Sequence, residues 1–88
     1  MAKPPPTLED LGRAIRRMRR DRGWTIDELA DRSGIHTTYL SRIERARSNA
    51  TWMKLAAVAE AFGLRPSDIA RAAENESDAR RKALDEQG

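Results

Sequence analysis

Polar and cationic side chains share one face of a short helix predicted between about residues 37 and 45. That face carries Thr38, Ser41, Arg42 and Arg45, with Thr37 at its edge. The hydroxyl groups donate and accept hydrogen bonds, the threonines add methyl groups and the arginines add cations, while the face carries no acidic side chain. These groups suit contact with the base edges and phosphates of nucleic acid.

The same sequence offers few groups for catalysis or metal binding. Ser33, Ser41 and His36 are the candidates for a nucleophile and a base, and paired carboxylates and a phosphate-binding glycine-rich loop are missing. The chain has no cysteine and one histidine, which excludes disulfides and argues against a zinc site. We therefore expect neither an enzyme nor a metal or cofactor.

The positive charge of the chain is concentrated in its N-terminal half. Residues 1–47 hold 11 lysines and arginines against 7 acidic residues, a balance of +4, whereas residues 48–88 hold 6 against 7, a balance of −1. Six arginines crowd one segment: Arg13, Arg16, Arg17, Arg19, Arg20 and Arg22. Either this half attracts a phosphate backbone, or the arginines are good helix formers on a solvated face.

The length of 88 residues favours one small domain with a thin core, built from helices packed on helices or supported by a second copy. The sequence has no apolar run long enough for a membrane span and no signal segment. We therefore expect a cytoplasmic protein with no membrane partner.

Apolar spacing and capping signals predict helices at 8–22, 25–32, about 36 or 37 to 45, 51–62, and a fifth from Pro66. Thr25 and Glu28 form a predicted capping box at the second helix. Ser33 and Gly34 end that helix in a tight turn, because glycine adopts the left-handed conformation at little cost. No strand pattern appears, so the expected fold class is all-α.

The two ends of the chain differ from this helical region. Residues 1–6 contain three consecutive prolines and are expected to form a flexible arm, which is either disordered or a minor-groove arm through Lys3. Residues 7–74 form the expected domain. Residues 75–88 are a polar, helix-prone tail with a poor apolar face.

The order of these elements resembles the lambda-repressor-like (Cro-like, xenobiotic-response-element) helix-turn-helix family. The matching positions are Leu11, Ile15, Arg16, Arg19, Gly23, Thr25, Glu28–Ala30, Gly34–Ile35, Tyr39–Ser41, Ile43–Arg45, Leu55, Ala59 and Phe62. The run TYLSRIER is also similar to restriction–modification controller proteins within that family. The resemblance implies a five-helix DNA-binding domain of a transcriptional regulator, associated with the nucleoid through its double-stranded DNA.

The resemblance also implies roles for individual residues. It makes residues 37–45 the recognition helix and assigns base reading to Thr37, Thr38, Ser41 and Arg42. It assigns contacts with the DNA backbone to Thr25, His36, Tyr39, Arg45, Arg47, Ser48 and Asn49. For Tyr39 the alternative is burial beside the second helix, and for His36 it is a capping role. Arg16 or Arg20 is a further candidate for a phosphate contact.

The chain departs from the family pattern at three positions. Ile26 replaces a common glutamine that touches phosphate, and Ala46 and Ala50 replace a common glycine and proline after the recognition helix. The loop that follows the recognition helix is still expected to turn, along a different path.

Further expectations concern structure and assembly. The resemblance pairs Arg19 with Glu44 as an ion pair between the first helix and the recognition helix. Family members commonly dimerise through their last helices, which suggests a homodimer with contacts at Trp52, Leu64 and Ile69. The alternative function is an antitoxin-like or other protein-interaction module, in which residues 75–88 fold on a partner protein.

Overall fold

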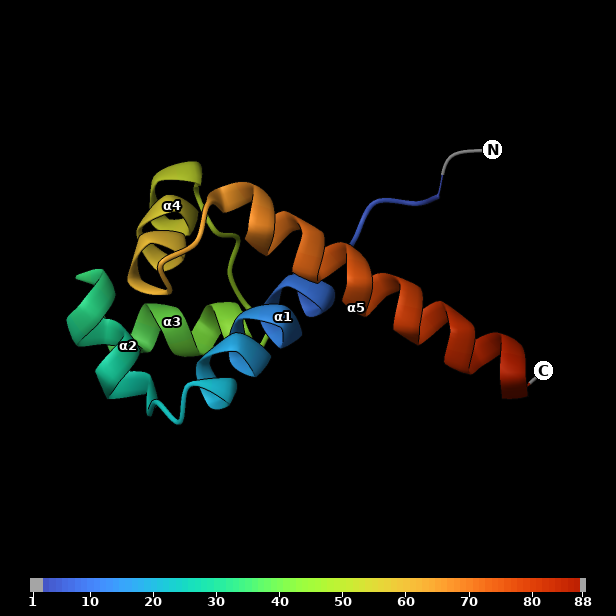
Figure 1. The fold of residues 1–88 in the computed structure, drawn as a ribbon, viewed down its shortest axis with the longest axis horizontal. Helices are drawn as coiled ribbons and strands as arrows, with labels where there is room; N and C mark the ends of the chain where they lie inside the picture. Colours follow the sequence, from blue (N-terminus) through green and yellow to red (C-terminus); the bar gives the residue numbers. More distant parts are fainter. Residues whose placement is uncertain (1–2, 88) are drawn as a thin grey trace.

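Five α-helices and their connections make up residues 3–87, the part of the chain that the computed structural model describes. The helices are α1 (Leu8–Asp21), α2 (Ile26–Ser33), α3 (Thr37–Glu44), α4 (Trp52–Ala61) and α5 (Pro66–Gln87). Figure 1 shows α1 to α4 gathered together, while α5 runs past α1 and projects beyond it. No strand occurs within residues 3–87, and the expected five-helix, all-α fold is confirmed.

Threonine side chains cap the first turns of three helices. Thr7 and Asp10 form a capping box at α1, and Thr25 and Glu28 form the predicted capping box at α2. At α4 the side chain of Thr51 accepts from the amide of Lys54. A threonine cap stabilises a helix by about 1 kcal/mol, so these short polar signals determine where each helix begins.

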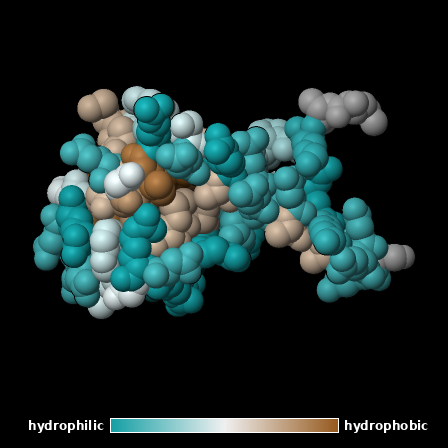
Figure 2. All heavy atoms as spheres, viewed as in Figure 1, coloured by the Kyte–Doolittle hydropathy of each residue, from teal (hydrophilic) through white to brown (hydrophobic). Residues whose placement is uncertain are grey.

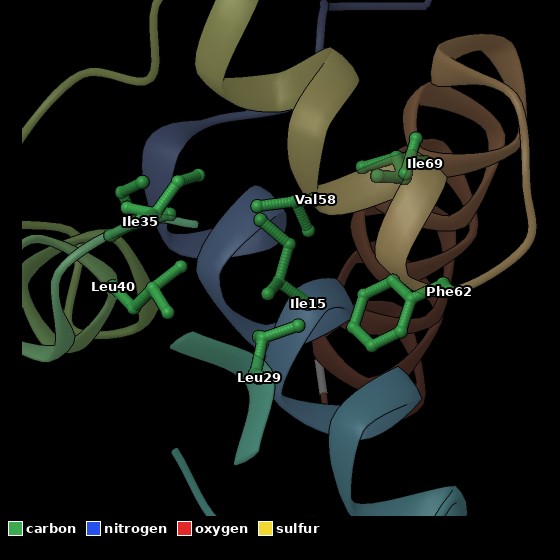
Figure 3. Close-up of a cluster of buried hydrophobic side chains, with 9 residues drawn as sticks. Ile15, Leu29, Ile35, Leu40, Val58, Phe62 and Ile69 are labelled. Carbon is green, nitrogen blue, oxygen red and sulfur yellow. The ribbon is translucent and has the colours of Figure 1, made fainter. Parts of the chain in front are cut away.

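One apolar cluster draws side chains from all five helices and from the α2–α3 turn (Figure 3). Its buried members are Ile15, Leu29, Ile35, Leu40, Ile43, Val58, Ala59, Phe62 and Ile69. Burial of each large aliphatic side chain contributes about 1.5–3 kcal/mol. Because α3 supplies Leu40 and Ile43 to this cluster, its inner face is held against the body of the domain.

The fifth helix is longer than the sequence pattern indicates. A polar, helix-prone tail was expected from residue 75, and α5 continues through it without a break to Gln87. It lies antiparallel to α1, and ion pairs join Asp10 to Arg80 and Arg17 to Glu76. The spacing of apolar residues does not reveal ion pairs, so it did not predict that the helix continues through this segment. No helix within residues 3–87 has a stretch that is both long and apolar enough to cross a membrane.

The N-terminal arm lies against α5 over the residues that the structure describes. Lys3 Nζ is 3.3 Å from Asp78 Oδ1, and Pro4 to Pro6 line a hollow of about 180 Å³ with residues of α5. Residues 3–6 therefore run beside α5, and all four remain exposed. Met1, Ala2 and Gly88 lie outside the described residues.

Trp24 joins the α1–α2 connection to the end of α4. Its ring stacks on the ring of Phe62 with 5.7 Å between centroids. The guanidinium groups of Arg22 and Arg32 lie over the two rings, at 4.6 Å from Phe62 and 4.3 Å from Trp24. These stacked cations and rings link the α1–α2 connection and the end of α2 to the end of α4.

Candidate nucleic-acid interface

The turn between α2 and α3 has the geometry that the sequence predicts. Gly34 adopts the left-handed conformation with φ of +74°, and its amide donates to the carbonyl of Ala30 at 2.8 Å. The hydroxyl of Ser33 accepts from the amide of Ile35, whose side chain is buried. The turn thus anchors the start of α3 in the core.

The outer face of α3 presents the residues that were predicted to read bases. Thr38, Arg42 and Arg45 are exposed, while Thr37 and Ser41, one turn apart on the same edge of the face, are half-buried. The structure places four of these side chains on α3 and Arg45 at its C-cap, opposite Leu40 and Ile43. The face carries no acidic group that would repel phosphate.

The two half-buried residues border separate hollows. Ser41 lines one of about 280 Å³, together with Arg16, Arg19, Ile26, Glu44 and Arg45. Thr37 and His36 line a more open one beside the α2–α3 turn, of about 510 Å³. The recognition helix therefore borders the α2–α3 turn at its N-terminal end and α1 toward its C-terminal end.

His36 caps the recognition helix. Its Nδ1 atom accepts a hydrogen bond from the amide of Thr38 at 3.1 Å, and the side chain is otherwise exposed. Of the two roles considered for this histidine, the structure has the capping role. The Nε2 atom remains free to donate to a phosphate oxygen or base.

Tyr39 holds the loop that follows the recognition helix. Its hydroxyl donates to the carbonyl of Asn49 at 2.6 Å, and Lys54 Nζ lies 4.8 Å from its ring centroid. A tyrosine hydroxyl has one hydrogen to donate. This hydroxyl could therefore donate to a phosphate only if its hydrogen bond to Asn49 broke. The two roles expected for Tyr39, phosphate contact and burial beside the second helix, did not include this hydrogen bond.

The loop after α3 turns as expected, although an alanine stands at the turning point. Ala46 adopts the left-handed conformation with φ of +59°. The amide of Arg47 donates to the carbonyl of Arg42 at 2.8 Å, and the amide of Ala46 donates to Ile43 at 3.0 Å. This pair of bonds is the Schellman motif that usually contains glycine. Arg47 and Asn49 are exposed on the loop beyond it, and Ser48 is half-buried.

Arg19 and Glu44 form a two-pronged ion pair between α1 and α3. Arg19 Nε lies 2.7 Å from Glu44 Oε2 and Nη2 lies 2.9 Å from Oε1, while Nη1 donates to the carbonyl of Trp24 at 2.8 Å. The side chains are 12% and 6% exposed. The hydrogen bonds to Glu44 raise the pKa of Arg19 and outweigh the opposing effect of burial. The pair fixes the end of the recognition helix.

Gly12 is a positioning residue that the sequence did not reveal. A Cβ atom at this position would lie 2.6 Å from the carbonyl oxygens of both Ile43 and Glu44. The backbone of α1 therefore touches the last turn of α3, and a residue with a side chain would push α3 outward. A glycine in the middle of a helix is the signal that points to such an approach.

Thr25 is committed to helix capping, because its hydroxyl accepts from the amide of Glu28 at 3.1 Å. The structure does not bring Thr25 into the hollow that α1, α2 and α3 share. The neighbouring Ile26 lines that hollow beside Arg16 instead.

The three residues suggested as dimer contacts have different environments. Trp52 is 67% exposed and Leu64 is half-buried, but Ile69 is fully buried in the core. Ile69 is thus wrong as a dimer contact, because its side chain fills the space between α5 and α4. Met53 is 75% exposed beside Trp52 and was not anticipated. The apolar composition of α4 on all sides is the signal that could have identified it.

Sequence and structure comparisons agree with this architecture. Residues 10–72 match the family described as Helix-turn-helix domain. The HTH-type transcriptional regulator y4dJ of Sinorhizobium fredii is 41% identical over 54 residues, which cover 61% of this chain and 70% of that protein. The name of this relative describes a transcriptional regulator.

Two solved structures share the fold. The clp gene regulator ClgR from Corynebacterium glutamicum superposes with a TM-score of 0.80 and 38% identity, covering 96% of this chain and 89% of ClgR. The restriction-modification controller protein C.AhdI from Aeromonas hydrophila gives a TM-score of 0.69 and 26% identity, covering 70% and 94%. With its two capped helices, tight glycine turn and polar third helix, the chain belongs to the helix-turn-helix domain family of transcriptional regulators.

Proposed function

We propose that this protein is a sequence-specific transcriptional regulator that binds double-stranded DNA as a homodimer on a pseudo-palindromic operator. One observation carries the proposal. The helix α3 exposes hydroxyl and guanidinium groups without an acid, while its opposite side chains Leu40 and Ile43 are 0% and 2% exposed. A helix that enters the major groove needs this combination of a fixed inner face and a polar outer face.

Base reading falls to the N-terminal and central part of α3. Thr37, Thr38, Ser41 and Arg42 lie at or beside its exposed face. Arg42 makes a two-pronged contact to guanine, and a threonine methyl contacts thymine. Each good two-pronged contact discriminates by about 1–3 kcal/mol, so Arg42 contributes most to specificity.

Backbone contacts surround this reading face. The proposed residues are Thr25, His36, Tyr39, Arg45, Arg47, Ser48 and Asn49. His36 lies at the turn, Arg45 at the end of α3, and Arg47, Ser48 and Asn49 in the following loop, which supports phosphate contacts on either side of the groove. The hydroxyl groups of Thr25 and Tyr39 already hydrogen-bond within the protein, so these two residues have less support. Such contacts orient the protein and do not read sequence.

A second copy is proposed to pack on the exposed apolar residues of α4. Trp52 and Met53 stand side by side in sequence at its start, and Leu64 follows its end half-buried. Figure 2 shows a hydrophobic area where α4 meets the start of α5, whereas the projecting end of α5 is mostly hydrophilic. A two-fold dimer would place the recognition helices about 34 Å apart, one turn of DNA.

The test of DNA recognition is selection of bound duplexes from a random pool by the full chain. We expect a two-fold symmetric motif whose enrichment is lost in Arg42→Ala. The matched control is Arg71→Ala, an exposed arginine on α5, which should select the same motif. Binding without any motif, or equal motifs from wild type and Arg42→Ala, would refute base reading by α3.

The test of the dimer is sedimentation equilibrium of the wild type and of Trp52→Ser/Met53→Ser. We expect a dimer for the wild type and a shift toward monomer for the variant, with an unchanged helical spectrum. Leu84→Ser, which removes an exposed leucine on the projecting end of α5, is the control. A monomeric wild type on a symmetric duplex would contradict the homodimer.

The alternative of a partner protein bound by residues 75–88 gains no support from the fold. That alternative assumed a segment that folds on binding, but residues 75–87 are already part of α5. Arg80 and Glu76 hold the helix against α1. Co-purification of a small protein that requires residues 75–88 would support this alternative.

A further inference from the structure

We propose that Tyr39 is a positioning residue that determines which spacing between operator half-sites the dimer prefers. It ties the recognition helix α3 to the first turn of α4, where the second copy is proposed to pack. The inference rests on the proposed function and extends it from the reading of bases to the choice of half-site spacing.

The first observation is that the proposed dimer surface lies on an exposed part of α4. Trp52 and Met53 are exposed in the first turn of this helix, whereas its buried residues, Val58 and Ala59, lie more than one turn further along. The loop of residues 45–51 separates that first turn from α3. The course of this loop therefore determines where the dimer surface stands relative to the recognition helix.

The second observation concerns what holds this loop. The hydrogen bonds of its Schellman turn end at Arg47, and beyond it the hydroxyl of Tyr39 donates to the carbonyl of Asn49 at 2.6 Å. Within residues 3–87, no other hydrogen bond involves residues 48–50. Ala50 adds a half-buried methyl contact with the apolar cluster. Such a contact is not directional, whereas a hydrogen bond has a preferred angle, so the bond from Tyr39 gives the loop its direction.

The third observation is that the same side chain reaches the first turn of α4. Lys54 Nζ lies 4.8 Å from the centroid of the Tyr39 ring, within the range of an attractive cation–π contact. Lys54 follows Met53 directly, and its amide donates to Thr51, which caps the helix. The ring of Tyr39 therefore holds the first turn of α4, and its hydroxyl holds the loop that leads to that turn.

These contacts restrict the geometry of a dimer on DNA. One additional base pair between the half-sites separates them by about 3.4 Å and rotates them by about 35° relative to one another. A dimer follows this change only if its recognition helices move relative to the surface that joins the two copies. The contacts of Tyr39 oppose this movement, so they favour one spacing over its neighbours.

The experiment measures binding of the full chain to the selected operator and to duplexes whose spacer is one base pair shorter or longer. The ratio of the dissociation constants for altered and original spacing gives the discrimination. A neutral hydrogen bond corresponds to about a factor of five in an equilibrium constant. For Tyr39→Phe, which keeps the aromatic ring beside Lys54, we expect the ratio to fall by about fivefold, with an unchanged helical spectrum.

A duplex with a single half-site distinguishes positioning from direct contact. Spacing has no effect on this duplex, so Tyr39→Phe should bind it as tightly as the wild type does. Equal weakening on the single half-site and at every spacing would mean that the hydroxyl contacts a phosphate, and this would overturn the inference.

Two variants serve as controls. Asn49→Ala keeps the backbone carbonyl that accepts from Tyr39, so it should keep the wild-type ratio. Asn75→Ala removes an exposed polar side chain from α5 and should keep both the ratio and the affinity. If the wild type has no preferred spacing, or if Tyr39→Phe has the wild-type ratio, the inference fails while base reading by α3 stands. A wild type that selects no motif contradicts the proposed function itself.

Discussion

Arg80 donates from two guanidinium nitrogens to the two carboxylate oxygens of Asp10, at 3.2 Å each, across a separation of 70 residues. The Asp10 side chain is fully buried. Burial by itself raises the pKa of Asp10, but hydrogen bonds from Arg80, Thr7 and Arg13 outweigh it and hold the pKa well below its usual value. The carboxylate therefore joins the start of α1 to the second half of α5.

Asp10→Asn should lower the free energy of unfolding at pH 7 by about 2 kcal/mol, because charged hydrogen bonds are lost from a buried site. A lowered pKa in the folded state means that the stabilisation is complete above the unfolded value of about 3.9 and disappears as the pH falls further. Urea denaturation should show the gap between wild type and variant narrowing below about pH 4. Asp85→Asn, at an exposed position, should match the wild type throughout.

Arg80→Ala should lower the melting temperature more than Lys82→Ala, an exposed neighbour on α5. The reason is that Asp10 then keeps only Arg13 and Thr7 as partners. Differential scanning calorimetry of the two variants checks this. Equal melting temperatures would mean that the end of α5 is not held by the pair.

Arg19→Ala should lower the free energy of unfolding by about 3 kcal/mol, because Glu44 would remain buried without its cation. Arg20→Ala should change it by no more than about 0.5 kcal/mol, as expected for a surface position. For a domain of this size, each kcal/mol shifts the melting temperature by about 4–8 °C. A double-mutant cycle with Glu44→Gln measures the coupling, and additive effects would contradict a direct pair.

Gly12→Ala should lower the free energy of unfolding by about 1–3 kcal/mol, because the added methyl group meets the carbonyls of Ile43 and Glu44 at 2.6 Å. The sign of this change is the test, because alanine in place of an ordinary helical glycine raises the free energy of unfolding by about 1 kcal/mol. Denaturant unfolding gives the value directly. A more stable variant would show that α1 and α3 have room to separate.

Ala46→Gly should raise the free energy of unfolding by about 0.5–1 kcal/mol. A residue with a side chain is strained at the φ of +59° that Ala46 adopts, and glycine is not. Ala50→Gly is the control, because Ala50 has no positive φ. It should lower stability slightly through the greater freedom of the unfolded chain. Thermal denaturation should therefore show a higher melting temperature for Ala46→Gly and a slightly lower one for Ala50→Gly.

The helices and their boundaries were largely predictable, because the signals for them are local. Thr25, Glu28 and Gly34 act within a few residues of their own positions, and apolar spacing identified the faces that carry Ile15 and Leu40. The polar face of α3 was predictable for the same reason.

Contacts between distant residues were predicted only where the family resemblance supplied them. It suggested the pairing of Arg19 with Glu44, but nothing in the sequence connected Asp10 with Arg80 or Gly12 with Glu44. Asp10 looked like an ordinary acidic residue at a helix start, and α5 seemed to end where its apolar spacing stops. The dimer contact at Ile69 failed because an apolar residue near a helix start can face the core or a partner with the same local pattern.

The packing of Lys3 on Asp78 brings both ends of the described chain to the same end of the molecule, away from α2 (Figure 1). A fluorophore, affinity tag or surface linker joined at either terminus would therefore start far from the α2–α3 turn. Protein immobilised through one end would keep α3 facing the solution. The fold thus permits single-molecule and surface-based binding measurements without an internal attachment site.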